Sequence, residues 1–113
     1  MELSKKDKKV AREIIDKGLQ REFEDGLNKA DSILQSWKTE VKDNKETYYQ
    51  LYEHIKNFDK HIAGRYDGIR GSSYLLTITG QMLDNVIQEE DLIDFSEEVR
   101  LYLMRTKKLL LED

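Results

Sequence analysis

The sequence predicts an all-α protein, an antiparallel bundle of four main helices with an additional helical segment at the N-terminus. The 113 residues contain no proline and only six glycines, a composition that suits long helices. Apolar residues recur at spacings of three and four, and the connections are short, as in an antiparallel bundle. The length is that of one domain, so we expect one domain over residues 1–113. The four main helices are expected at about 19–42, 46–66, 72–90 and 95–111, and the N-terminal segment at about 4–17.

The first two expected helices present their apolar residues on different faces. Ser4 can cap the N-terminal segment, whose apolar positions are Val10, Ala11, Ile14 and Ile15. A second series then runs through Leu19, Phe23, Leu27, Ala30, Leu34, Trp37 and Val41. On an uninterrupted helix, Val10 and Ile14 would point about half a turn away from this second series. We therefore favour a break near Gly18, and the alternative is one long helix that offers two faces to two partners.

The remaining three helices follow from turns, caps and apolar stripes. Asp43-Asn44-Lys45 indicates a turn, and the stripe of the next helix consists of Tyr48, Leu51, Tyr52, Ile55, Phe58, Ile62 and Tyr66. Ser72 or Ser73 can cap the third helix, whose broad apolar face predicts a central place in the bundle. The fourth helix begins near Asp94, and its predicted buried stripe consists of Phe95, Val99, Tyr102, Leu103, Thr106, Leu109 and Leu110.

Composition and charge argue against several classes of protein. The absence of cysteine rules out disulfides, thiolate nucleophiles and cysteine-ligated metals. The net charge of −4 disfavours general nucleic-acid binding, which depends on basic residues that neutralise phosphates. No apolar run reaches the roughly 20 residues of a membrane span, and the N-terminus is lysine-rich where a signal peptide would be apolar. We therefore expect a cytoplasmic protein that does not bind a membrane.

The polar residues contain no recognisable catalytic or metal-binding motif. His54 and His61 are two turns apart on one helix, which is too far for one metal ion without ligands from elsewhere. Glu-x-x-Asp pairs such as Glu22 and Asp25 resemble magnesium ligands, but no second acidic set accompanies them. We therefore expect no metal and no cofactor, and we favour a non-enzymatic role.

One segment carries the chemistry of an anion site. Two arginines, Arg65 and Arg70, flank a glycine loop that leads into a helix start at Gly71, Ser72 and Ser73. Free backbone N–H groups, two hydroxyls and the positive end of a helix dipole could together bind phosphate or carboxylate. The alternative is purely structural, with glycines that permit the turn and a serine that caps the helix.

Some apolar residues exceed what the four expected stripes need. Leu101, Met104 and Leu111 lie about 140–160° from the predicted core stripe of the last helix, and Val10 and Ile14 are out of phase in the first segment. These five residues could meet within one chain, pack against a second copy, or bind another protein. We predict an interaction or scaffolding protein that self-associates through helix faces, and the alternative is a small anion- or phosphate-binding module or enzyme.

Overall fold

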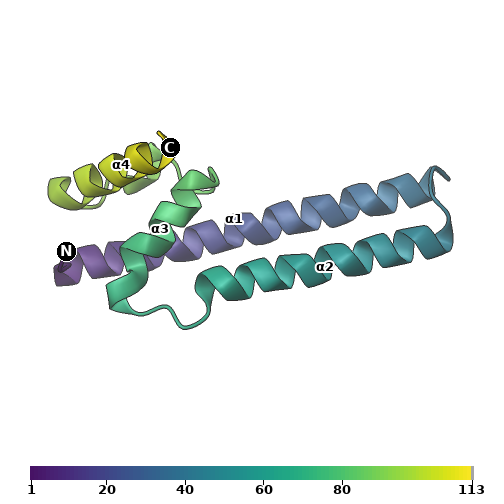
Figure 1. Ribbon diagram of the computed structural model, residues 1–113, viewed down its shortest axis with the longest axis horizontal. Helices are drawn as coiled ribbons and strands as arrows, with labels where there is room; N and C mark the ends of the chain where they lie inside the picture. Colours follow the sequence, from purple (N-terminus) through teal and green to yellow (C-terminus); the bar gives the residue numbers. More distant parts are fainter. Residues whose placement is uncertain (113) are drawn as a thin grey trace. The chain divides into compact units, whose positions relative to one another are not determined.

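The structure is a computed structural model, and it describes residues 1–112 of the chain. Two short 3₁₀ turns, Gly71–Ser73 and Glu89–Leu92, stand between longer helices. No strand occurs in residues 1–112, so the predicted all-α class with four main helices is confirmed. The helices are α1 Lys5–Lys38, α2 Asn44–Tyr66, α3 Tyr74–Leu83 and α4 Glu97–Leu111 (Figure 1).

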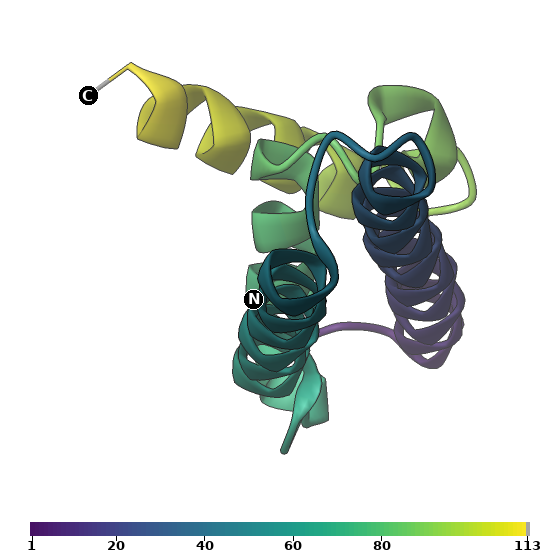
Figure 2. The same cartoon turned by 90° about the vertical axis from the view of Figure 1, so that its right-hand side faces the viewer.

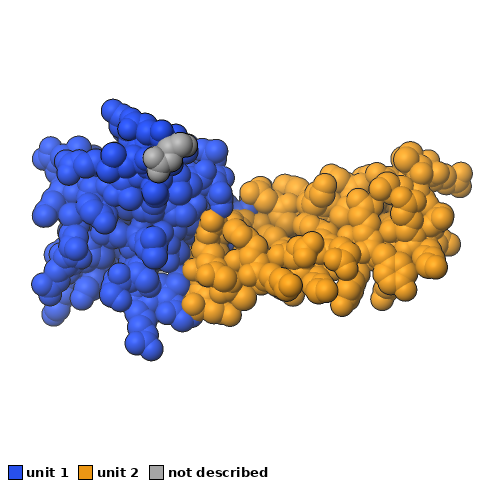
Figure 3. Space-filling model, viewed as in Figure 1, with its two compact units in different colours: residues 1–21, 68–113 blue, residues 22–67 orange. Residues whose placement is uncertain are grey.

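The contacts of the chain divide it into two compact units (Figure 3). Unit 1 contains residues 1–21 and 68–113, and unit 2 contains residues 22–67. The helix α1 begins in unit 1 and ends in unit 2. We describe each unit by itself.

The helix α1 is continuous, so the predicted break near Gly18 is wrong and the alternative of one long helix is correct. A Cβ atom at residue 18 would lie 2.1 Å from Nε2 of Gln81 in α3. This Gln81 amide instead donates a hydrogen bond of 3.0 Å to the carbonyl oxygen of Ile15. A glycine inside a helix costs about 1 kcal/mol, and close packing of Gln81 against the bare backbone offsets this cost.

The core of unit 1 combines the start of α1 with α3, α4 and their connection. The largest fully buried apolar side chains are Ile78, Met82, Ile87, Leu92 and Leu103. The first turns of α1 contribute four more buried residues, Val10, Ala11, Ile14 and Ile15. The out-of-phase face of α1 is therefore part of a core within the chain.

The helix α3 ends at Leu83, seven residues before the predicted end at residue 90. Asn85 adopts a left-handed conformation, with φ of 59°. The N–H groups of Asn85 and Val86 donate to the carbonyl oxygens of Met82 and Gln81, a pairing known as a Schellman motif. This motif turns the chain, so that Ile87 is buried although it no longer belongs to the helix.

Two aspartates, the buried Asp7 and the half-buried Asp91, attach α4 and the connecting segment to α1. The guanidinium of Arg21 donates two hydrogen bonds to the Asp91 carboxylate, at 2.8 and 3.1 Å, and a third to the carbonyl oxygen of Val86. The hydrogen bond from Arg21 holds the pKa of Asp91 at about 2, against desolvation that would raise it. Asp7 accepts hydrogen bonds from the backbone N–H and the hydroxyl of Ser96, the N-cap of α4.

Unit 2 is an antiparallel hairpin formed by the second half of α1 and by α2, which lie side by side in both views (Figures 1 and 2). A turn between the two helices is confirmed, but it lies at residues 39–43, because α1 ends at Lys38 and the Asp43 side chain caps α2 by accepting from the N–H of Glu46. Asn44 and Lys45, predicted in the turn, are the first two residues of α2. Glu40 is left-handed, with φ of 63°, and closes α1 with the same pairing of N–H groups as at the end of α3. The hairpin therefore has a tight tip at residues 39–43.

Candidate interaction surface

The base of the hairpin is held together by polar contacts. Glu22 is buried, and one of its carboxylate oxygens accepts hydrogen bonds from Nε2 of His61 at 2.5 Å and from Arg65 at 3.0 Å. Its other oxygen accepts a short hydrogen bond from the hydroxyl of Tyr66. A buried carboxylate needs such partners, since an unpaired charge away from water is costly. Glu22 therefore joins the base of the two helices.

Further up the hairpin, the two helices approach closely at Gly26. The ring of Phe58 lies so near that a Cβ at residue 26 would be 2.9 Å from it. Phe23 packs edge-on against the same ring, with centroids 5.6 Å apart. Nε2 of His54 donates to the carbonyl oxygen of Gly26 at 2.8 Å. These contacts fix which side of each helix faces inward.

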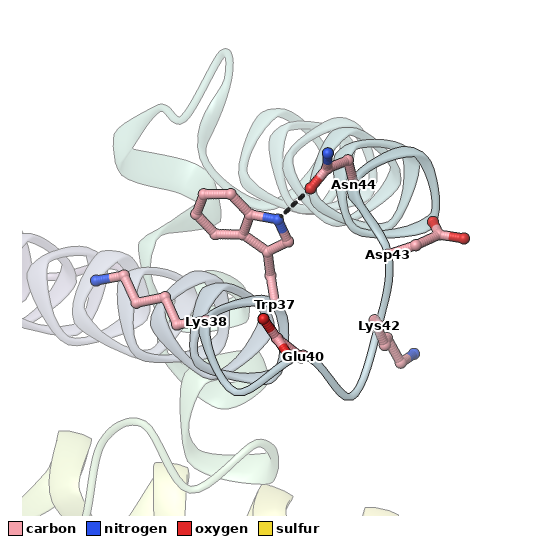
Figure 4. Close-up of a pocket in the computed structure, with 6 residues that line it drawn as sticks. All are labelled: Trp37, Lys38, Glu40, Lys42, Asp43 and Asn44. Carbon is pink, nitrogen blue, oxygen red and sulfur yellow. Dashed lines mark hydrogen bonds between the residues drawn. The ribbon is translucent and has the colours of Figure 1, made fainter.

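At the tip, Trp37 binds the first residue of α2. Its indole N–H donates to Oδ1 of Asn44 at 2.7 Å, and the two side chains point toward each other across the turn, while Lys42 and Asp43 point away (Figure 4). An open depression of about 570 Å³ surrounds this contact, and its other lining residues are charged. The contact at Trp37 sets the register of the hairpin at its far end.

One side of the hairpin is apolar. Measured at about 100° per residue from the inward-facing Glu22, the side chains of Phe23, Leu27 and Leu34 lie at about 100–140°. Measured likewise from the inward-facing Thr47, those of Tyr48, Tyr52 and Ile55 lie at about 80–140°. Because the helices are antiparallel, rotation in the same sense leads to the same side of the hairpin. Together with Ala30, these residues form what we call the apolar face, Phe23, Leu27, Ala30, Leu34, Tyr48, Tyr52 and Ile55.

Apart from Gly64, the opposite side of the hairpin carries polar and charged residues at the corresponding angles. They are Asp25, Asn28, Ser32 and Gln35 on α1 and Glu46, Glu53, Asn57 and Lys60 on α2. By contrast, the large side chains of the apolar face are exposed, from 41% for Phe23 to 71% for Leu27, with Leu34 less so. The prediction that these stripes fill the core of a bundle within one chain is therefore wrong for Leu27, Tyr48, Tyr52 and Ile55. Within the described residues, a two-helix hairpin offers no further layer to cover them.

Of the residues predicted as an interface, two are buried in the core of unit 1 and the other three lie on α4. Val10 and Ile14 are 8% and 4% exposed, so they belong to the core of unit 1 and form no exposed face. Leu101 and Leu111 are exposed, and together with the half-buried Met104 they form a strip along α4. This strip lines a shallow depression of about 610 Å³ whose other residues are Arg105, Lys107, Lys108 and Glu112. Tyr102, Leu109 and Leu110, predicted to be buried, are exposed as well.

The residues predicted to bind an anion are distributed over both units. Arg65 belongs to unit 2, where it binds Glu22, whereas Arg70, Gly71, Ser72 and Ser73 belong to unit 1. The hydroxyl of Ser73 accepts from the N–H of Arg70 and donates to its carbonyl oxygen, so it closes the turn and does not cap α3. Gly71 and Ser72 line a depression of about 160 Å³ together with apolar and polar residues such as Leu75, Thr79 and Tyr102. The turn of the structural alternative is therefore present, but Ser73 does not provide its helix cap.

Sequence reasoning missed the Glu22 contacts. In the sequence, Glu22 forms a Glu-x-x-Asp pair with Asp25 on the same helix, whereas in the structure the partners of Glu22 lie on α2. A signal was nevertheless present, since Glu22 adjoins the apolar stripe at Phe23 and faces His61 and Arg65, which are four residues apart on the next helix. Among residues 1–112, no group of three or more histidine, aspartate or glutamate side chains is arranged to hold a metal ion.

No protein-family model matches the chain, and neither a curated protein nor a solved structure shows detectable similarity to it. Of the helices in the described residues, none has the length and apolar character needed to span a membrane.

Proposed function

We propose that this protein is a non-enzymatic interaction or scaffolding protein that self-associates, and that two copies pack the apolar faces of their hairpins together into a four-helix bundle. The observation that carries the proposal is the contrast between the two sides of unit 2. Seven positions on one side are apolar, with Asp59 near the base as the exception in that sector, and eight on the other side are polar. In a hairpin that acted alone, this contrast would leave a contiguous apolar surface exposed to water, and such a surface marks an interaction site.

The size of the apolar face supports a stable contact. Its five most exposed side chains, Phe23, Leu27, Tyr48, Tyr52 and Ile55, together expose on the order of 500 Å², given the 150–250 Å² that one aromatic side chain can bury. A specific interface of standard size buries about 800 Å² per partner. The apolar face and its rim therefore approach the area that a stable dimer requires.

The composition of the apolar face supports a second copy as the partner. A dimer with twofold symmetry uses the same patch on both chains, so the patch must be complementary to itself. An apolar face with a small residue, Ala30, between larger ones meets this condition, since two such faces can interdigitate. Two antiparallel helices are also half of a four-helix bundle, whose core they complete on pairing.

Matched charge substitutions on the two sides of the hairpin test the proposal. Leu27→Glu and Ile55→Glu place a carboxylate on the apolar face, whereas Asn28→Glu and Asn57→Glu place one on the polar side of the same helices. In size-exclusion chromatography with light scattering, we expect a dimer for wild type and both controls, and a monomer for the two apolar-face variants. Dimers of unchanged strength in all four variants would exclude this face. A wild-type monomer would exclude self-association itself.

The strip on α4 is a second surface for the same kind of activity. Leu101 is 52% exposed and Leu111 is 62% exposed, and basic residues adjoin both. Leu101→Glu and Met104→Glu test whether this strip contributes to association. A weaker dimer in these variants would include α4 in the interface, and an unchanged dimer would leave the apolar face of the hairpin as the sole contact.

A further inference from the structure

The apolar face carries charges only near its two ends, and they differ in sign. Lys38 and Lys45 lie beside the tip, at about 160° from the inward direction of their helices. Asp59 lies at about 120° on α2, near the base, in the same sector as Tyr48 and Tyr52. All three side chains are exposed, and none makes an ion pair within the described part of the chain.

Two identical faces can pack with twofold symmetry in two ways. If the axis runs along the hairpin, the tips meet, and α1 of one copy lies over α2 of the other. Lys38 then lies over Lys45 of the partner subunit, and both Asp59 residues remain at the base without a cation. If the axis runs across the hairpin, the tip of each copy meets the base of the other. Like charges meet in the first arrangement and opposite charges in the second.

The register within the hairpin locates the crossing axis. Glu22 is level with His61, and Trp37 with Asn44, so paired residues on the two helices have numbers that sum to about 82. Lys45 and Asp59 are equidistant from Tyr52 on α2. An axis at Tyr52 therefore places Lys45 against Asp59 of the partner subunit, and it crosses α1 near Ala30.

The same axis also places large apolar residues of one copy beside large apolar residues of the other. On α2 it places Tyr48 beside Ile55 of the partner subunit, since both are three or four residues from Tyr52. On α1 it places Leu27 beside Leu34 of the partner subunit. The axis itself passes Ala30, whose small side chain allows the two α1 helices to approach closely. One choice of axis thus pairs charges at both ends and large apolar side chains between them.

From this agreement we infer that the two hairpins pack tip to base, with a twofold axis at Tyr52 and Ala30 and with Lys45 of each copy paired to Asp59 of the other. The inference rests on the proposed self-association and specifies its geometry. Exposed ion pairs contribute little to affinity, so their main effect is to select this orientation over the tip-to-tip one.

Cross-linking of single-cysteine variants distinguishes the two orientations, because the chain has no cysteine of its own. Lys45→Cys and Asp59→Cys are treated with a short bis-maleimide, each alone and as an equimolar mixture. We expect covalent dimers in the mixture and few in either variant alone. Efficient cross-linking of Lys45→Cys alone would establish the tip-to-tip arrangement and overturn the inference. Dimers by light scattering that cross-link in no sample would overturn it as well.

Charge reversal provides a second measurement that does not depend on cross-linker reach. Lys45→Glu and Asp59→Lys should each weaken the dimer, by roughly tenfold in Kd, and the double variant should restore it. An Asp59→Lys variant with wild-type affinity would contradict the inference, since Asp59 has no cation opposite it when the tips meet. If wild type sediments as a monomer, the proposed self-association is wrong. If wild type is a dimer but the double variant does not restore the affinity that the single variants lose, only the proposed orientation is wrong.

Discussion

Gln81 occupies the space that a side chain at residue 18 would need, with its amide nitrogen 2.1 Å from the position of a Cβ there. The same amide donates a hydrogen bond to the carbonyl oxygen of Ile15. This contact joins α3 to α1 within unit 1, and it explains how a glycine can lie inside a helix of 34 residues.

Gly18→Ala should therefore destabilise unit 1, although alanine is the better helix former. We expect a loss of about 2–3 kcal/mol in the free energy of unfolding, because the Gln81 side chain must move and its hydrogen bond breaks. Urea unfolding followed by circular dichroism measures it. Gly64→Ala is the matched control, since nothing lies within 4 Å of a Cβ there, and it should stabilise by up to about 1 kcal/mol. Equal stabilisation by both substitutions would contradict the packing of Gln81.

Glu22→Gln should weaken the base of the hairpin. The substitution removes the charge that Arg65 and His61 bind and turns one acceptor into a donor that faces other donors. Since His61 is 41% exposed, water replaces part of the loss, and we expect about 1–3 kcal/mol. Faster amide hydrogen exchange near the end of α2 would report it. Glu24→Gln, at an exposed position of the same helix, should change stability by less than about 0.5 kcal/mol, and equal effects of the two would refute the role of Glu22.

Acid should destabilise unit 1 through Asp91. Its pKa is about 2 in the folded protein, chiefly because of the hydrogen bond from Arg21, and about 3.9 in an unfolded chain. A depressed pKa stabilises the folded state above the unfolded value, and this contribution disappears as the pH falls from about 4 to 2. Arg21 is 41% exposed, so we expect only about 1–2 kcal/mol.

Urea midpoints between pH 2 and 7 test this prediction. Asp91→Asn should be less stable than wild type at pH 7, and the difference should shrink as the pH falls below 4. Asp7 also loses its stabilising effect in acid, but equally in wild type and in Asp91→Asn. Burial would raise the pKa of Asp7, but the hydrogen bonds from Ser96 and Ser4 outweigh burial and lower it. A difference between wild type and Asp91→Asn that is independent of pH would contradict the assignment to Asp91.

The sequence predicts elements well where local signals determine them. The start of α2, expected at residue 46, lies at Asn44, and the start of α4, expected at residue 95, lies at Glu97. The prediction of a helix break at Gly18 is wrong because the residue that compensates for the glycine, Gln81, is 63 positions away in the sequence. At Asn85 a local stop signal was present, but the apolar Val86 and Ile87 continued the helical period beyond it.

Periodicity also identifies an apolar stripe without revealing what covers it. The stripes through Leu27 and Tyr52 were found correctly, yet they are exposed in the chain, while Val10 and Ile14, predicted as an interface, are buried. An apolar position looks the same in the sequence whether its partner is in the same chain or in another molecule. Only the arrangement of the helices shows which stripes lack a partner.

Sedimentation equilibrium of the wild-type protein tests the central claim most directly. Over roughly 1–100 μM, we expect the average mass to rise from near 13.4 kDa toward twice that value, as mass action requires of a reversible dimer. The Leu27→Glu variant should remain near 13.4 kDa over the same range. A wild-type mass of 13.4 kDa at every concentration would contradict self-association through the apolar face.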